Sequence, residues 1–114
     1  MRQAAISNVY PVQLQQLRCY RVRAFEAYPR VTHAVFTRQG GYSQGPFASL
    51  NLGSAVGDEP ETVKKNYLQV CQALQLSPEQ TISCHLIHSA HVLTIDSTNR
   101  QRHLGKADGL VTAE

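Results

Sequence analysis

The most regular pattern of hydrophobic and polar positions begins just after Asp58. Apolar side chains recur there at intervals of four, three and four residues, which places them on one face of a helix over about residues 59–75. Asp58 can cap this helix, with Glu61 three residues on as in a capping box, and Pro60 fits the first turn. We expect the helix to end near Leu76, because the serine–proline pair that follows cannot continue it. The predicted apolar face consists of Val63, Tyr67, Val70 and Leu74.

Short runs of β-branched and aromatic residues on both sides of the helix predict strands. Residues 31–37 form one such run, whereas residues 9–17 are weakly periodic and predict an irregular or strand-like entry. The polar residues 96–105 predict a loop. Together these elements predict an α/β fold, with mixed β-sheet layers flanked by helices. The other predicted strands are residues 22–25, 81–87, 92–95 and 109–112.

Two glycine-containing loops precede the predicted helix. In residues 38–46, the adjacent Gly40 and Gly41 allow positive φ angles and a close approach of the backbone to another group. Arg38 lies at a predicted strand end beside these flexible N–H groups, an arrangement that can hold phosphate or carboxylate. Its spacing alone favours a surface arginine beside a loop. Asn51, a polar residue between two leucines, could cap a turn or point into a pocket.

Thiol and imidazole groups cluster from Cys84 to His91, and both are natural ligands of zinc. In a strand, His85 and His91 would share one face while His88 would point the other way. The step of three residues also differs from the step of four that is typical of zinc-binding helices. The spacing therefore favours one ligand of a site completed elsewhere, and His88, at the predicted turn, is the best placed. Asp108 could cap the start of a strand or be a buried acid, and the cap is the favoured interpretation.

Composition and charge exclude several classes of protein. The 114 residues are 42% hydrophobic and 17% charged, which is typical of one globular domain or a piece of one. The net charge of +3 is small, and the basic residues fall into two groups without interleaved aromatic residues, which argues against a nucleic-acid partner. No apolar run suits a membrane span or a secretory signal, and the three cysteines are widely spaced, as in proteins with reduced thiols. We therefore expect a cytoplasmic protein with no membrane partner.

Five segments, in order, resemble the motifs of the YfiH-type family. That family was first described as laccase-like multicopper polyphenol oxidoreductases and is now regarded as zinc-dependent purine nucleoside phosphorylases. One segment alone would be a weak match, whereas five in the family's order and spacing are specific. Residues 33–43 resemble H-G-F-S-T-R-x-G-G-V-S, residues 45–53 G-P-Y-x-S-L-N-L-G, residues 56–66 V-G-D-D-P…V…N-R, residues 86–92 Q-V-H-G-x-x-V, and residues 106–112 A-D-A-L-V-T.

The resemblance implies that residues 1–114 are the N-terminal portion of a larger laccase-like domain, with the motif-bearing part at about residues 31–112. A predicted apolar strand at the end of the sequence also suggests a fragment, because such a strand needs a neighbour. Two further family segments, A-D-C and H-A-G-W-R-G, do not occur in this sequence. In the family they supply a cysteine and a histidine that complete a metal site with the histidine matched by His88. Leu86 and Ser89 depart from the family's glutamine and glycine beside that histidine.

For the complete protein, the resemblance implies a zinc-dependent purine nucleoside phosphorylase that also deaminates adenosine. Its partners would be phosphate and a purine nucleoside (adenosine, inosine, guanosine or methylthioadenosine), and its products a free base and ribose 1-phosphate. The resemblance makes His88 a zinc ligand and Arg38 the partner of phosphate, with His85 and His91 as non-ligands. The remaining implied pocket residues are Asn51, with a catalytic role, and Gly40, Gly41 and Asp108.

Two alternatives remain open. A copper-dependent polyphenol oxidase would also suit a laccase-like domain, but one matched histidine cannot supply a multicopper cluster. The 114 residues alone could also be a structural half-domain without activity, which would bind zinc weakly because one histidine leaves the coordination sphere mostly to water.

Overall fold

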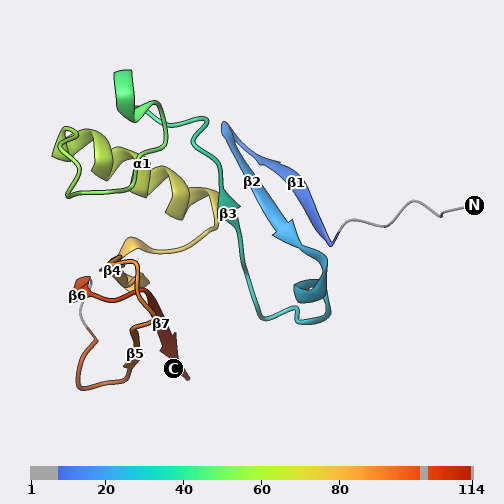
Figure 1. Cartoon of the computed structure of the whole chain (residues 1–114). Coiled ribbons are helices and arrows are strands. Elements are labelled where there is room, and N and C mark those ends of the chain that lie inside the picture. Colours follow the sequence, from blue (N-terminus) through green and yellow to red (C-terminus); the bar gives the residue numbers. More distant parts are fainter. Residues whose placement is uncertain (1–7, 101–102, 114) are drawn as a thin grey trace, which may run out of the picture. The chain divides into compact units, whose positions relative to one another are not determined.

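The computed structural model of the chain describes residues 8–100 and 103–113 (Figure 1). Its contacts divide the chain into two compact units, residues 1–75 and residues 76–114, and each is described by itself. Antiparallel strands and a long helix occur in the first unit, and parallel strand pairs occur in the second. The predicted α/β class is therefore confirmed. Within the described ranges, no helix combines the length and the apolar character needed to cross a membrane.

The first unit contains three strands, β1 (Val9–Leu14), β2 (Leu17–Val22) and β3 (Val35–Phe36). They form an antiparallel sheet in the order β1-β2-β3. β1 and β2 are joined by a two-residue turn, in which Gln15 has a φ of +57°. The stretch predicted as strand-like is thus a hairpin. Leu17 and Cys19, which alternate along β2, are fully buried and form the core of this sheet.

Two strand predictions in the first unit need correction. Residues 22–25 are not a strand, because β2 ends at Val22 and a 3₁₀ helix, η1 (Arg23–Ala27), follows. The Arg-Ala-Phe-Glu-Ala sequence of η1 is rich in good helix formers, which explains the difference. Residues 31–37 shorten to β3, because only two positions there pair with β2, at Cys19 and Tyr20.

Helix α1 (Pro60–Ala73) confirms the predicted helix, with Pro60 in its first turn. Its N-cap is Glu59 and no side chain caps it, so the predicted capping box from Asp58 is wrong. The carboxylate of Asp58 is instead engaged by a loop, as described below. The buried positions of α1 also differ from a purely apolar stripe, since two polar residues are among them: Val63, Asn66, Gln69 and Cys71.

The second unit contains η3 (Pro78–Gln80) and four short strands, β4 (Ser83–His85), β5 (Val92–Ile95), β6 (His103–Lys106) and β7 (Gly109–Thr112). β4 pairs with β6 and β5 pairs with β7, both in parallel. The strands predicted at 92–95 and 109–112 are confirmed, and the strand predicted at 81–87 shortens to β4. The loop predicted at 96–105 is wrong at its end, because backbone pairing with β4 makes residues 103–106 a strand.

Candidate functional site

The loop that carries Arg38 and Asn51, residues 38–53 (the glycine loop), is closed at its base by backbone hydrogen bonds. The Arg38 carbonyl accepts bonds from the Ser49 and Leu50 N–H groups at 2.9 and 2.8 Å. The Ser49 hydroxyl donates to the same carbonyl at 2.9 Å and accepts from the Gly41 N–H at 3.1 Å. The carbonyl of Arg38 therefore closes the loop, and these bonds do not involve its guanidinium.

Gly40 and Gly41 are required by close backbone contacts. Gly40 has a φ of +95°, and a Cβ there would lie 2.1 Å from the carbonyl oxygen of Gln16. A Cβ at Gly41 would lie 2.2 Å from the carbonyl oxygen of Ser49. The two glycines thus let the loop pack against the β1–β2 turn and against its own far end.

The Arg38 side chain is exposed beside an open hollow of about 490 Å³. Among the residues that the structure describes, no carboxylate pairs with its guanidinium. A free guanidinium beside glycine backbone suits an anion. The hollow is lined by Arg38, Gln39, Gly45, Pro46, Ala48 and Ser49.

Asn51 caps a turn, which is one of the two roles predicted for it. Its Oδ1 accepts from the Gly53 N–H at 3.0 Å, while its Nδ2 donates to the Gly53 carbonyl at 3.3 Å and to Asp58 Oδ2 at 3.1 Å. The side-chain amide is thereby engaged by the chain itself. A catalytic role for Asn51 stays a prediction.

A buried polar network joins the glycine loop to helix α1. Asn66, which is fully buried, accepts from the Tyr42 N–H at 2.7 Å and donates to Ser43 Oγ at 2.9 Å and to the Asn51 carbonyl at 2.8 Å. The Ser43 hydroxyl donates to Asp58 Oδ2 at 2.6 Å. The hydrogen bond from Ser43, followed by that from Asn51, holds the pKa of Asp58 below its usual value. The network therefore holds the glycine loop against helix α1.

Ser43, Asn66 and Gln69 also fix the glycine loop, although none of them was predicted to belong to the site. Gln69 Nε2 donates to the Gly40 carbonyl at 2.8 Å, and its Oε1 is buried without a partner among the described residues. The signal was present, because Asn66 and Gln69 follow Val63 at steps of three on the buried side of α1. A polar residue on the buried side of a helix is expected to hydrogen-bond to a neighbouring segment, because buried polar groups are rarely left unpaired.

The second unit places His88 at a turn between β4 and β5, residues 86–91 (the His88 turn), as predicted. His88 is exposed and has a φ of +58°, which is uncommon for residues other than glycine. His85 and His91 are exposed as well. Among the described residues, no three His, Cys, Asp or Glu side chains gather closely enough to hold a metal ion. The described residues therefore do not complete a metal site, and His88 differs from the other two exposed histidines by its positive φ.

Asp108 binds the backbone of the His88 turn. Its Oδ1 accepts from the Ile87 N–H at 3.0 Å, and its Oδ2 accepts from the Ser89 N–H at 3.1 Å and the Ser89 hydroxyl at 2.6 Å. The Ser89 hydroxyl makes the largest contribution to lowering the pKa of Asp108 to about 2. Asp108 is half-buried and precedes β7, yet its carboxylate serves the turn rather than capping the strand.

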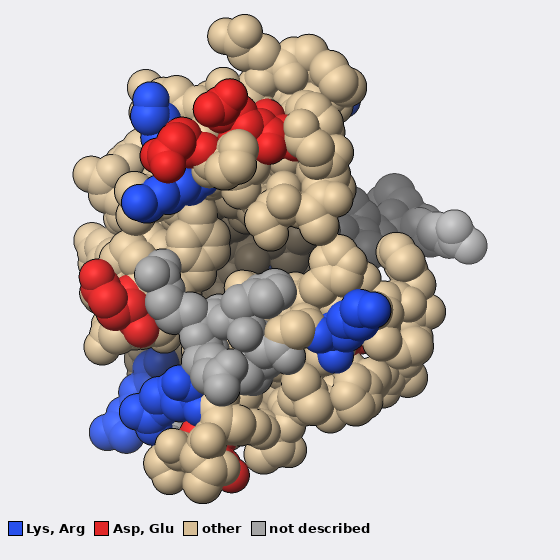
Figure 2. Space-filling model, turned by 90° about the vertical axis from the view of Figure 1, so that its left-hand side faces the viewer, with Lys and Arg blue, Asp and Glu red and all other residues tan. Residues whose placement is uncertain are grey.

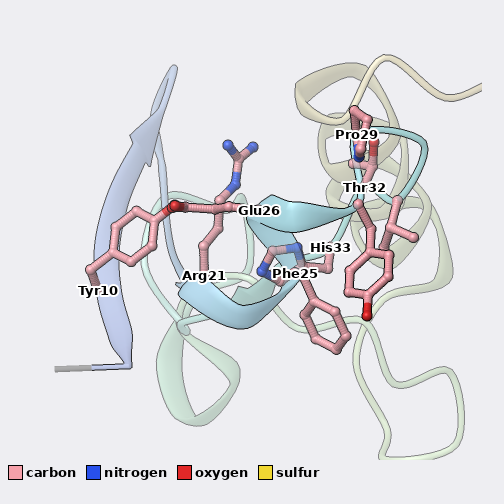
Figure 3. Close-up of a pocket in the computed structure, with 9 residues that line it drawn as sticks. Tyr10, Arg21, Phe25, Glu26, Pro29, Thr32 and His33 are labelled. Carbon is pink, nitrogen blue, oxygen red and sulfur yellow. The ribbon is translucent and has the colours of Figure 1, made fainter.

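A second hollow of the first unit, of about 250 Å³, is lined by residues of the β1–β2 hairpin, of η1 and of the segment 28–33 that follows it (Figure 3). His33, at the start of the first family-like motif, lines it. Its Nε2 accepts from the Val22 N–H at 2.7 Å, and its ring contacts Phe25 edge-on at 4.7 Å between centroids. His33 is thus engaged in structure, and none of the predicted site residues lines this hollow.

Described basic residues occur in both units: Arg18, Arg21, Arg23, Arg30, Arg38, Lys64 and Lys65 in the first, and Arg100 and Lys106 in the second. On the face shown in Figure 2, Lys and Arg form small groups and Asp and Glu occur on the same face. The expectation that the protein acts without nucleic acid stays a prediction.

Comparison with known proteins defines the class to which this fold and these motifs belong. Two solved structures resemble the chain: YlmD from Geobacillus stearothermophilus, with a TM-score of 0.76 and 27% identity, and the hypothetical protein YfiH from Bacillus licheniformis, with a TM-score of 0.73 and 23% identity. Each comparison covers 90% of this chain and 40% of the other. The second likeness concerns the fold alone.

The sequence model of the family described as multi-copper polyphenol oxidoreductase laccase matches residues 32–114. The chain belongs to this family, which confirms the YfiH-type resemblance. A purine nucleoside phosphorylase of Corynebacterium glutamicum is 40% identical over 87 residues, and one of Streptomyces coelicolor is 37% identical over 83 residues. These matches cover 75% and 72% of this chain, but 35% and 34% of the relatives. The chain thus spans about a third of the length of the curated relatives it matches.

Proposed function

We propose that the complete protein containing this chain is a zinc-dependent purine nucleoside phosphorylase. The observation that carries this proposal is the similarity to relatives named purine nucleoside phosphorylase, which are 33–40% identical over most of the chain. Because the chain spans about a third of those relatives, residues 1–114 would form an N-terminal portion of the active domain.

In the proposed reaction, an oxygen of phosphate forms a bond to C1′ of the ribose as the bond from C1′ to the purine nitrogen breaks. The electron pair of the broken bond stays on the purine, which takes up the proton that the phosphate loses. The products are ribose 1-phosphate and a free base. The same site would deaminate adenosine, with water replacing the amino group and ammonia leaving.

Arg38 is the residue that would hold the phosphate. Its guanidinium is exposed beside an open hollow, while its carbonyl is used to close the glycine loop. A planar cation in this position can bind two oxygens of a phosphate and offset their charge during attack. Gly40, Gly41 and Asn51 would contribute by shaping the loop that presents Arg38.

His88 is the residue that would bind zinc. Its exposed imidazole at the apex of the His88 turn fits the donor chemistry of the metal, and the other ligands would come from parts of the complete protein outside these 114 residues. Zinc with an open coordination position supplies polarisation of a bound phosphate or water. Within this chain, the contribution of His88 is to hold the ion at a defined position.

The test is phosphate-dependent release of hypoxanthine from inosine by the complete gene product, in parallel with Arg38→Ala and His88→Ala. We expect each variant to lower kcat/KM by on the order of a hundredfold. Arg30→Ala and His85→Ala are matched controls, because both side chains are exposed and neither is assigned to the site. Equal rates for His88→Ala and His85→Ala would remove His88 from the site.

The family description favours a second candidate, a copper-dependent polyphenol oxidase. Metal analysis of protein purified without added metal separates the two functions. Stoichiometric copper together with phenol oxidation would replace the phosphorylase, whereas zinc together with phosphorolysis supports it.

A further inference from the structure

The backbone on either side of His88 is held by one carboxylate. The Ile87 N–H donates to one oxygen of Asp108 at 3.0 Å, and the Ser89 N–H donates to the other at 3.1 Å. His88 lies between these two donors with a φ of +58°. A non-glycine residue keeps such a conformation only when its surroundings determine it, and here the flanking hydrogen bonds do so.

The backbone that carries this carboxylate is bonded to both ends of the turn. The Asp108 N–H donates to the His91 carbonyl at 2.7 Å, and the neighbouring Ala107 N–H donates to the His85 carbonyl at 3.0 Å. Ala107 is fully buried. Asp108 therefore starts from backbone that is bonded at both ends of the His88 turn, so its side chain acts from a fixed base.

Ser89 adds a contact that glycine could not make. Its hydroxyl donates to Asp108 Oδ2 at 2.6 Å and accepts from the His91 N–H at 3.3 Å. Ser89 is not among the described residues with positive φ, so serine fits this backbone without strain. The departure from the glycine of the family motif thus strengthens the link between the turn and Asp108.

We propose that Asp108 is a positioning residue for His88, and that the Ser89 hydroxyl completes its hold on the turn. This inference rests on the proposed function, in which His88 binds the metal. By fixing both flanking peptides, Asp108 sets the direction in which the His88 side chain leaves the backbone, so less order has to be imposed when the metal binds. Asp108 itself need not contact metal or substrate.

Asp96 provides a matched control in the same unit. Its carboxylate also accepts a backbone N–H and a hydroxyl, both from Thr98, within an exposed turn that carries no histidine. Asp96→Asn therefore removes a comparable turn contact without touching the His88 turn. In Asp108→Asn, one oxygen becomes an NH₂ group that faces N–H donors, so part of the hold is lost.

The experiment measures zinc affinity of the complete protein by chelator competition, and the visible absorption spectrum of the cobalt-substituted form. We expect Asp108→Asn to raise the Kd for zinc roughly tenfold and to change the cobalt spectrum, in line with other residues that orient metal ligands. Ser89→Ala should raise the Kd by about threefold, as expected for the loss of one hydrogen bond. Asp96→Asn should leave both readouts unchanged.

A folded Asp108→Asn protein, checked by circular dichroism, with unchanged Kd and spectrum would overturn the inference. If Asp108→Asn does not fold, Ser89→Ala decides, and an unchanged Kd in that variant overturns the inference too. His88→Ala separates this result from the proposed function. If His88→Ala keeps the Kd of the unmodified protein, the metal role of His88 is wrong, whereas a weakened His88→Ala beside an unaffected Asp108→Asn rejects only the role of Asp108.

Discussion

The glycine loop and the His88 turn are both irregular segments tied by an aspartate, but they are held in different ways. Asp58 is one member of a network in which the fully buried Asn66 carries much of the hydrogen bonding. In the His88 turn, which is exposed throughout, the carboxylate of Asp108 accepts from the Ile87 N–H, the Ser89 N–H and the Ser89 hydroxyl. The glycine loop is therefore held mainly by a side chain of helix α1. The His88 turn is held mainly by the side chain of Asp108, directly before β7.

The residues of the family-like motifs have two different roles in these segments: some hydrogen-bond to the backbone, and others extend into solvent. In the glycine loop, the amide of Asn51 is engaged by Gly53 and Asp58, so a motif residue builds the loop. In the same loop, the Arg38 side chain stays exposed, and in the His88 turn so does His88. A motif can therefore combine residues that fix a backbone with residues that the fixed backbone presents.

The largest effect on stability is expected from Asn66→Leu, which breaks the network of the glycine loop. Leucine keeps a similar volume but leaves the Tyr42 N–H and the Asn51 carbonyl without the bonds from Asn66, and the Ser43 oxygen loses its donor while its hydroxyl still donates to Asp58. We expect the free energy of unfolding to fall by about 3 kcal/mol, because three hydrogen bonds in a buried or partly buried network are lost together. Urea denaturation measures the change.

Gln72→Leu is the control for this substitution, since Gln72 is an exposed amide on the same helix. It should change the free energy of unfolding by less than about 0.5 kcal/mol. Similar losses for the two variants would show that the network contributes little to the stability of the loop.

A smaller effect is expected from Gly41→Ala, which tests the close packing of the glycine loop. The added Cβ would meet the Ser49 carbonyl oxygen at 2.2 Å and the Leu50 Cα at 2.5 Å, so the backbone has to move. The cost should be about 2 kcal/mol, within the range for overpacked sites. At Gly53 the nearest atom outside its chain neighbours is Asn51 Oδ1 at 3.4 Å, so Gly53→Ala should cost clearly less. The melting temperatures of the two variants decide, and equal losses would contradict the contact at Gly41.

Local signals in the sequence predicted the elements that depend on local pattern. Helix α1, β5 and β7 follow from periodicity and strand propensity, and the turn at His88 follows from its place between two strands. β6 could not be predicted in this way, because its strand conformation depends on pairing with β4. The strand predicted at 22–25 was wrong because η1 is too short for its apolar side chains to show a helical period. Its composition, which favours a helix, was the only local signal.

The residues of the candidate site also differ in whether local sequence could predict them. Arg38 and His88 were found because their side-chain chemistry and position are visible in the sequence, and the structure leaves both exposed. The partners that fix their loops were harder to find. Asp108 lies 19 positions from Ser89 in the sequence, and Asn66 lies 24 positions from Tyr42. Only the fold brings such residues together, so the spacing along α1 can mark Asn66 as buried but cannot identify the residues to which it bonds.

The smallest effect, and the sharpest comparison of the two aspartates, is expected from acid. The pKa of Asp108 is lowered from 3.8 to about 2 in the folded protein, with the Ser89 hydroxyl as the first cause. The unfolded chain therefore binds a proton at higher pH than the folded chain, and the stabilisation by Asp108 is present above about pH 4 and lost as the pH falls toward about 2. Asp108→Asn lacks this titration, so its deficit in melting temperature should shrink across that window.

Melting temperatures of the unmodified protein, Asp108→Asn and Ser89→Ala, taken from about pH 6 down to about pH 2, measure this change. Ser89→Ala should show a smaller deficit that shrinks over the same window, because it removes one of several bonds to the carboxylate while leaving the Ile87 and Ser89 N–H donors in place. A deficit of Asp108→Asn that stays constant with pH would mean that the ionised carboxylate is not what holds the His88 turn. A shrinking deficit ties the conformation of His88 to the charge of Asp108, whereas the buried amide of Asn66 should keep holding the glycine loop when the carboxylates are protonated, because it does not titrate.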